Sequence, residues 1–285
     1  TEAKGEILMA ARHKMIASSM IAIGILFTLV GFTSGGNWYV IKDNSGFYVP
    51  KEQTLAPQSY ELGAFKNIII SIEHSDIELL PSDSFSMEVI AFKPTDVTYV
   101  VKGDTLTVKS NNTNNNAMTI GFGPFKTPSI KIYVPTDVLL SNITIDSSFG
   151  DINLEKLKYE QFNLDVSYGD VSFKNVESGH TEITNAFGDI SLQQFTSESL
   201  VVHNEYGDIG IAGELNGKTT INSSFGDIDL QLLNNKNALG FELSTSFGDL
   251  TVNEKDYGTK LSQLHEGKNQ LEVSLSQGDL ELTLK

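Results

Sequence analysis

The sequence contains no cysteine and only one arginine, Arg12. Without cysteine the chain cannot form a disulfide framework, a thiolate metal site or a thiol nucleophile. After Arg12 the chain also lacks the guanidinium group, whose planar fork binds carboxylates and phosphates through paired hydrogen bonds. These absences argue against an enzyme that cleaves uronates or teichoic acids.

Motifs of common enzyme classes are missing as well. The sequence has no Gly-x-Ser-x-Gly, no His-Glu-x-x-His and no Gly-Lys-Ser/Thr pattern, which are signatures of serine hydrolases, zinc peptidases and phosphate-binding loops. We therefore expect no enzyme, and we assign no catalytic, cofactor-binding or metal-binding residue. A glycoside hydrolase with paired carboxylates is the remaining enzymatic alternative, and a deep groove that holds such a pair would favour it.

Basic residues are outnumbered by acidic ones, 20 Lys and Arg against 36 Asp and Glu, so the formal net charge is −16 at pH 7. Such a chain repels nucleic acid, whose binding depends on Lys and Arg contacts to phosphate. Anionic wall polymers and lipid headgroups would also be repelled unless divalent cations bridge them. The charge is compatible with a protein partner, or with a neutral or cationic ligand.

Charge is entirely absent from residues 15–41. The apolar part of this stretch is long enough to cross a bilayer as a helix, which needs about 20 residues. Trp38 and Tyr39 follow it, as aromatic residues do at membrane interfaces. Arg12 and Lys14 precede it, which places the N-terminus in the cytoplasm and the rest of the chain outside.

The N-terminal region is thus predicted to comprise a cytoplasmic tail (1–14), a single-pass transmembrane anchor (15–36) and a linker (37–62), in a protein of the cell membrane. The alternative is a signal peptide that is cleaved near Ser34-Gly35-Gly36. Both interpretations export the rest of the chain.

The second half of the sequence repeats one short phrase, an aromatic residue followed by Gly-Asp and an aliphatic residue. The first copy is Phe149-Gly150-Asp151-Ile152. Its glycine returns at positions 150, 169, 188, 207, 226, 248 and 278, with steps of 19, 19, 19, 19, 22 and 30 residues, and in the last copy Gln277 replaces the aromatic residue. A phrase that recurs at a fixed interval is typical of stacked structural repeats.

Apolar residues flank each phrase at two-residue spacing, as in a half-buried strand. In the third copy, Ile183 lies before Gly188, and Ile190 and Leu192 follow it. The alternation of apolar and polar positions shifts by one residue across Gly-Asp, so the chain must turn a corner there. Glycine supplies the unusual backbone angles of such a corner, and aspartate can bond back onto the backbone. One unit is then a strand, a Gly-Asp corner, a second strand and a return loop.

Two short strands are only marginally stable in water, so the units are expected to stack, at about 4.8 Å per coil. The sequence therefore predicts an all-β chain with a parallel β-solenoid (β-helix) of coils of about 19 residues over 141–285. Irregular β coils over 63–140 would cap its N-terminal end, and within them His74-Ser75-Asp76-Ile77 and Lys102-Gly103-Asp104-Thr105 resemble degenerate corners. An antiparallel β-sandwich is the alternative, but it does not explain a fixed register.

Four segments resemble the bacterial putative-adhesin family, a domain of unknown function, together with the serial Phe/Tyr-Gly-Asp-Ile units. The segments are Phe65–Ile68, Ser75–Leu79, Gly103–Val108 and Ile130–Pro135. In particular they resemble its membrane-anchored LiaG-type members, over about residues 63–285. The resemblance implies a β-helical extracytoplasmic domain of a Gram-positive bacterium, associated with cell-envelope stress. It implies no catalytic residues.

Stacking would align the corner residues in columns. We expect each corner aspartate to cap its own turn and face water, with Ca²⁺ held between carboxylates as the alternative. We expect the aromatic residues before the glycines to pack internally, with a sugar-stacking strip as the alternative. The aspartates are Asp151, Asp170, Asp189, Asp208, Asp227, Asp249 and Asp279, and the aromatic residues are Phe149, Tyr168, Phe187, Tyr206, Phe225 and Phe247.

The function expected from these features is that of a non-enzymatic extracytoplasmic module that contacts other envelope proteins. A self-assembling or adhesive scaffold is the second hypothesis, since Asp279–Lys285 would form an unpaired edge if it were the last coil. A carbohydrate-active enzyme is the third.

Overall fold

The computed structural model describes residues 19–28, 30–31, 39–43, 46–48, 57–91, 97–110, 118–121, 128–265 and 267–285. The predicted tail (1–14) lies outside these residues, and the predicted anchor and linker are described only in part. Residue contacts divide the chain into one unit of Thr1–Glu52 with Thr113–Lys126, and a second unit of Gln53–Asn112 with Thr127–Lys285.

The first unit contains a short helix and a small sheet. Residues 19–28 and 30–31 are helical, and no helix among the described residues has the length and apolar character needed to cross a membrane. Strands β1 (Tyr39–Asp43), β2 (Gly46–Tyr48) and β9 (Met118–Gly121) form an antiparallel sheet in the order β2-β1-β9. β9 comes from the range 63–140, for which irregular coils were predicted.

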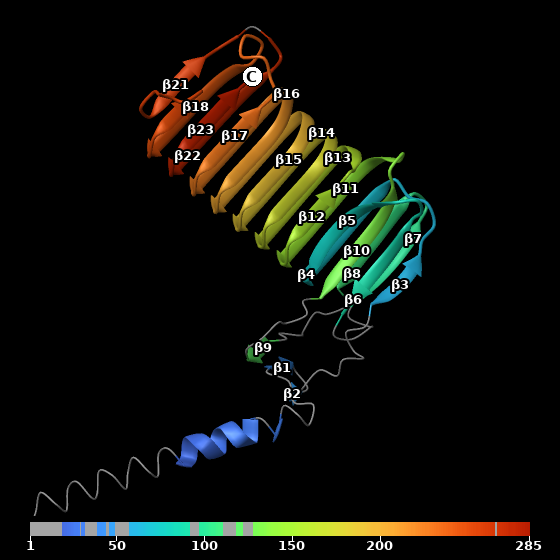
Figure 1. Ribbon diagram of the computed structural model, residues 1–285. Helices are drawn as coiled ribbons and strands as arrows, with labels where there is room; N and C mark the ends of the chain where they lie inside the picture. Colours follow the sequence, from blue (N-terminus) through green and yellow to red (C-terminus); the bar gives the residue numbers. More distant parts are fainter. Residues whose placement is uncertain are drawn as a thin grey trace, which may run out of the picture. The chain divides into compact units, whose positions relative to one another are not determined.

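The second unit is one continuous sheet wound into coils (Figure 1). Its strands are β3 (Gln58–Glu61), β4 (Asn67–His74), β5 (Asp76–Ser82), β6 (Ser86–Ile90), β7 (Val97–Lys102), β8 (Thr105–Ser110), β10 (Ser129–Pro135), β11 (Leu139–Phe149), β12 (Ile152–Glu155), β13 (Lys158–Tyr168), β14 (Val171–Phe187), β15 (Ile190–Tyr206), β16 (Ile209–Phe225), β17 (Ile228–Leu232), β18 (Gly240–Phe247), β19 (Leu250–Val252), β20 (Lys255–Asp256), β21 (Lys260–Gln263), β22 (Gln270–Gln277) and β23 (Leu280–Leu284).

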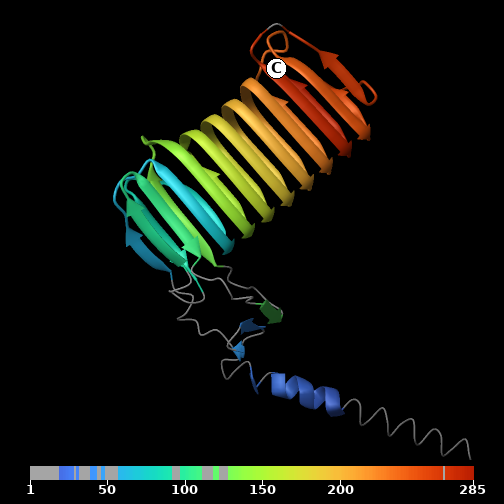
Figure 2. The same cartoon turned by 180° about the vertical axis from the view of Figure 1, so that it is seen from behind.

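Parallel pairing in the predicted 19-residue register holds the coils together. Val171 pairs with Ile190, which pairs with Ile209, which pairs with Ile228. These aliphatic side chains are buried and form ladders along the core. The expectation of an all-β chain with stacked parallel strands is confirmed, and Figure 2 shows the same row of strands from behind.

Each coil bends three times, which the sequence did not predict. In β14, pairs of outward-facing residues interrupt the alternation at Lys174–Asn175 and at Gly179–His180, and the third bend is Gly188-Asp189. Asn175 has φ 56°, and Lys156 and Gln194 have φ 50° and 51° at the equivalent places. Strand pairing continues around the coil, so the predicted return loop is wrong.

The first coil is formed by β4 and β5, which stack on β11 and β12 in the same register. The predicted corner at Asp76 is confirmed, because its carboxylate accepts the backbone N–H of Asp151 at 3.0 Å. The predicted corner at Gly103-Asp104 is wrong, because these residues form the turn of the antiparallel hairpin β7-β8.

The C-terminal strands lie inside the stack rather than at its end. β22 pairs with β16 on one side and β18 on the other, and β23 pairs with β17 and β19. In Figure 1 the red strands β22 and β23 accordingly lie among orange ones. The premise of an unpaired edge at Asp279–Lys285 is therefore wrong.

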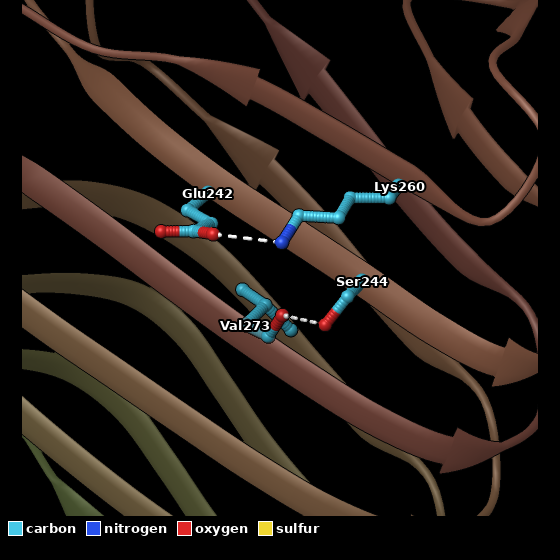
Figure 3. Close-up of polar contacts among 4 residues, drawn as sticks. All are labelled: Glu242, Ser244, Lys260 and Val273. Carbon is cyan, nitrogen blue, oxygen red and sulfur yellow. Dashed lines mark hydrogen bonds and ion pairs between the residues drawn. The ribbon is translucent and has the colours of Figure 1, made fainter.

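Antiparallel strands cover both ends of the solenoid. At the N-terminal end, β8 and β10 stack in parallel on β4 and β5 of the first coil. β7 pairs with β8, and β6 and β3 extend the sheet from β10. At the opposite end, β21 pairs with β18 and β20 with β19. Figure 3 shows Lys260 of β21 beside Glu242 of β18, where the two form an ion pair of 3.1 Å, and Ser244 of β18 bonding to the carbonyl of Val273 in β22.

Candidate functional site

The corner aspartates form a continuous column of hydrogen bonds between coils. Oδ1 of Asp189 accepts the backbone N–H of Asp208 at 2.8 Å, and the N–H of Asp189 donates to Oδ1 of Asp170 at 2.9 Å. The same bond recurs at each step from Asp76 to Asp249, with distances of 2.8–3.0 Å. Each carboxylate that accepts such a bond therefore caps the next coil of the stack, which corrects the expectation that it caps its own turn.

No metal site is evident along this column. The carboxylates are exposed to solvent, as predicted. Among the residues that the structure describes, no group of three or more His, Cys, Asp and Glu side chains is placed to hold a metal ion.

The corner glycines bring adjacent backbones into close contact. Gly188 has φ +142°, and a Cβ there would lie 2.1 Å from the carbonyl oxygen of Gly169. Behind the corner, Nδ2 of Asn185 donates to the carbonyl oxygens of Gly169 and Gly188, at 3.2 and 3.1 Å. Asn204 makes the equivalent bonds one coil further. The glycine is therefore required by both its conformation and its packing.

The aromatic residues before the glycines are not in the core, which corrects the expectation of internal packing. Phe149, Tyr168, Phe187, Tyr206 and Phe225 are 37–46% exposed, and Phe247 is 73% exposed. Their ring centroids are 4.8–4.9 Å apart and the rings are parallel to within 5°. His74 continues this aromatic ladder at its N-terminal end. Because each ring covers the face of the next, the ladder offers ring edges to solvent and is unsuited to stacking against sugars.

A lateral groove lies on the outer face of the side that precedes the corner. It has a volume of about 390 Å³ and crosses β13, β14, β15, β16 and β22. Two rows of outward side chains line it. The first row is Asp165, Thr184, His203, Asn222 and Ser274, and the second is Ser167, Ala186, Glu205, Ser224 and Ser276. The floor between them is formed by Val166, Asn185, Asn204 and Ser223.

The groove contains two carboxylates, Asp165 and Glu205, which belong to coils two steps apart. At about 4.8 Å per coil they are offset by roughly 10 Å along the axis, with a further lateral offset between the rows. Glycoside hydrolases hold their paired carboxyl groups about 5 to 9.5 Å apart. The arrangement does not favour the hydrolase alternative.

One buried hydroxyl lies deep in the core. Tyr159 is 1% exposed and its hydroxyl is 2.9 Å from Oγ1 of Thr181. Burial raises the pKa of this hydroxyl, while the contacts with Thr181 and Ser178 oppose the shift. Tyr159 is therefore a neutral core residue rather than an acid or base available to a ligand.

Comparison with known proteins gives a family match. The family model described as Toastrack DUF4097 matches residues 65–283. No curated protein matches the chain.

Several solved structures are similar to the chain at low identity. A putative adhesin from Bacteroides fragilis is 14% identical with a TM-score of 0.43, covering 83% of this chain and 99% of its own. A putative cell adhesion protein from Clostridium sporogenes is 12% identical with a TM-score of 0.38, covering 81% and 99%. A putative lipid binding protein from Parabacteroides distasonis is 13% identical with a TM-score of 0.32, covering 80% and 96%.

Proposed function

The chain belongs to the Toastrack DUF4097 family, and from this premise we propose that it is a non-enzymatic surface module of the LiaG type. In this proposal it is anchored in the membrane of a Gram-positive bacterium and acts in the envelope stress response by contact with other envelope proteins. Its strongest support is the regularity of the solenoid, whose strands on both sides of the corner stay in register from coil to coil between Asn67 and Leu284, while the register shifts between β15 and β16 at Gln193/Phe195 and Ser197/Ser199.

The repeat itself supports a non-enzymatic role. Catalytic groups act as a cluster whose members differ in function, so a catalytic site would interrupt the columns. The corner columns instead keep Gly and Asp at every step from Gly150 to Asp279, and the Asp side chains are used in bonds between coils.

Membrane anchoring is supported by the N-terminal sequence. Residues 15–41 carry no charge, and large apolar side chains on the described helix are exposed, among them Met20 at 69% and Phe27 at 72%. Exposed apolar side chains in such number are unfavourable in water and suit a lipid environment. The basic residues Arg12 and Lys14 favour an N-terminus on the cytoplasmic side.

Cell fractionation and crosslinking test the proposal. An epitope after Lys285 should be digested by protease added to intact wall-free cells, and an epitope before Thr1 should not. The double variant Ile23→Lys/Leu26→Lys should leave the membrane fraction, because each central lysine costs about 3 kcal/mol on insertion. Val100→Lys, an exposed position of the solenoid, is the matched control and should stay in the membrane.

The partner is identified by crosslinking in cells treated with a wall-active antibiotic, followed by mass spectrometry. We expect membrane-associated envelope proteins, lost in the double lysine variant. A C-terminal epitope that is protected in intact cells would contradict the proposed location, and reproducible turnover of a wall polymer by the purified chain would contradict the non-enzymatic role.

A further inference from the structure

We propose that the lateral groove binds a single extended chain of a neutral polysaccharide, laid along the solenoid axis across successive coils. This inference goes beyond the proposed protein contacts and does not depend on the membrane anchor. It follows from the shape of the groove, the chemistry of its lining and the spacing of its rows.

The groove presents equivalent positions at regular intervals. Its first row is in strict register from strand to strand, Asp165 with Thr184, Thr184 with His203, His203 with Asn222 and Asn222 with Ser274. Each step equals one coil, about 4.8 Å, which is close to the length of one pyranose unit in an extended chain. Successive sugars of one chain would therefore meet successive members of each row.

The polar groups of the groove are largely unused within the protein. Nδ2 of Asn222 lies 3.4 Å from Nδ1 of His203. The hydroxyls of Ser167, Thr184 and Ser224 have no hydrogen bond to another described residue. Hydroxyl and amide groups both donate and accept hydrogen bonds, as do the hydroxyls of a sugar. Asp165 and Glu205 add acceptors for sugar hydroxyls.

The lining also excludes other ligand classes. No lysine or arginine lines the groove, and the net charge is −16, so an anionic polymer would be repelled. An apolar ligand would remove water from these hydroxyls and carboxylates without replacing their hydrogen bonds, which is costly. A neutral polyhydroxylated chain is not repelled by the negative charge, and its hydroxyls can replace the hydrogen bonds that water makes to the groove.

The strands under the groove hold its side chains in place. Asn185 and Asn204, in the floor, are buried and are tied to the glycine carbonyls of adjacent coils. A preorganised site loses little conformational entropy on binding. The open, shallow geometry and the hydrogen bonds exposed to water nevertheless point to a Kd of about 1 mM to 10 µM for a tetrasaccharide.

Isothermal titration of the full-length chain in detergent micelles tests the site. The probes are chitotetraose and cellotetraose as neutral chains, and tetragalacturonate as an anionic chain of the same length. Thr184→Trp on β14 and Ser224→Trp on β16 would fill the groove at separate coils. Ser172→Trp is the matched control, because Ser172 lies on the same strand as Thr184 but outside the groove.

We expect saturable binding of at least one neutral tetrasaccharide and weaker binding of tetragalacturonate. Each groove variant should weaken binding by tenfold or more, and Ser172→Trp should leave it unchanged. Melting temperatures identify a groove variant that fails to fold. The binding measured with the other groove variant then tests the proposal. The proposal is overturned if neither neutral chain binds at millimolar concentration, if tetragalacturonate binds more tightly, or if folded groove variants bind like the parent.

Discussion

At the scale of single residues, the corner glycine carries the tightest steric constraint. Gly188→Ala would place a Cβ 2.1 Å from the carbonyl oxygen of Gly169, far inside van der Waals contact, at a residue with φ +142°. We expect a loss of about 3 kcal/mol or more in the free energy of unfolding, measured by urea titration.

The control is Gly210→Ala on β16, where a Cβ meets no atom within 4 Å. Glycine costs a strand interior roughly 0.5–1 kcal/mol relative to alanine, so this variant should be neutral or slightly stabilising. Equal losses in the two variants would contradict the close stacking at the corner.

The corner aspartate is expected to act as a hydrogen-bond acceptor rather than as a charge. Asp189→Ala removes the acceptor for the N–H of Asp208 and should cost about 1–2 kcal/mol. Asp189→Asn keeps an oxygen acceptor and relieves repulsion from the neighbouring carboxylates, about 1 kcal/mol per pair in water. Its unfolding free energy should therefore stay within about 0.5 kcal/mol of the parent, and an asparagine variant as unstable as the alanine variant would refute this account.

Alkaline unfolding should report the buried tyrosine. The pKa of Tyr159 is raised by burial in the folded state, whereas an unfolded tyrosine titrates near pH 10. Above about pH 10 the unfolded state therefore binds fewer protons, and stability falls as pH rises. Tyr159→Phe should cost about 1 kcal/mol at pH 8 because the bond to Thr181 is lost.

This deficit of Tyr159→Phe should shrink by about 1.4 kcal/mol between pH 8 and pH 11, since phenylalanine has no proton to lose. Urea titrations at pH 8 and pH 11 give the difference, in which the other tyrosines cancel. A deficit that does not change with pH would show that the Tyr159 hydroxyl ionises equally in both states.

Residue identity alone predicted the corners but not every side chain around them. The shift of the alternation at Gly188-Asp189 shows that the chain bends, and it does. It does not show toward which side the preceding aromatic residue points, so Phe187 was expected inside and lies outside. The bend at Lys174–Asn175 and the equivalent bends of neighbouring coils carry Lys156, Asn175 and Gln194 at positive φ. These residues share only a polar side chain, which many other outward-facing positions of the coil also have.

At the scale of elements, the inserted C-terminal strand is the feature that best tests the topology. Ser274 of β22 lies between β16 and β18, so a proline there must lose a ladder hydrogen bond and should cost several kcal/mol. Ser262 of β21 pairs only with Glu242 of β18. Since Thr245 donates to Thr259, alternation places the N–H of Ser262 away from β18.

Ser262→Pro is therefore expected to unfold within about 1 kcal/mol of the parent, while Ser274→Pro unfolds far more easily, both measured by thermal melting. If β22 were instead an outer strand with one free edge, the two prolines would have similar effects.

The 19-residue spacing predicted which residues stack but not the order of the final coils. The irregular steps of 22 and 30 residues allow either sequence order or insertion, because β18 and β22 present equivalent alternations, Phe241-Leu243-Thr245 and Leu271-Val273-Leu275. Pairing of a strand with two partners depends on the whole stack, so local pattern could not decide it. The lateral groove was missed for the same reason, since it arises only when rows from five strands are aligned.

At the scale of the whole molecule, the antiparallel strands that cover both ends of the solenoid are expected to oppose self-assembly. A solenoid with bare terminal strands can add further strands at either end, whereas here antiparallel strands pair with both terminal coils. The formal net charge of −16 adds repulsion between copies. We therefore expect light scattering in detergent to give a mass that is independent of concentration.

The covering strand β21 can be released to test this reasoning. Leu261 and Leu243 form a hydrogen-bonded pair by the same alternation, so Leu261→Pro should detach β21 from β18 and expose the edge of β18. Its mass should then grow with concentration, and that of Ser262→Pro should not. Growth in the parent itself would restore the scaffold hypothesis, because assembly would then proceed with both ends covered and must use a lateral face of the solenoid.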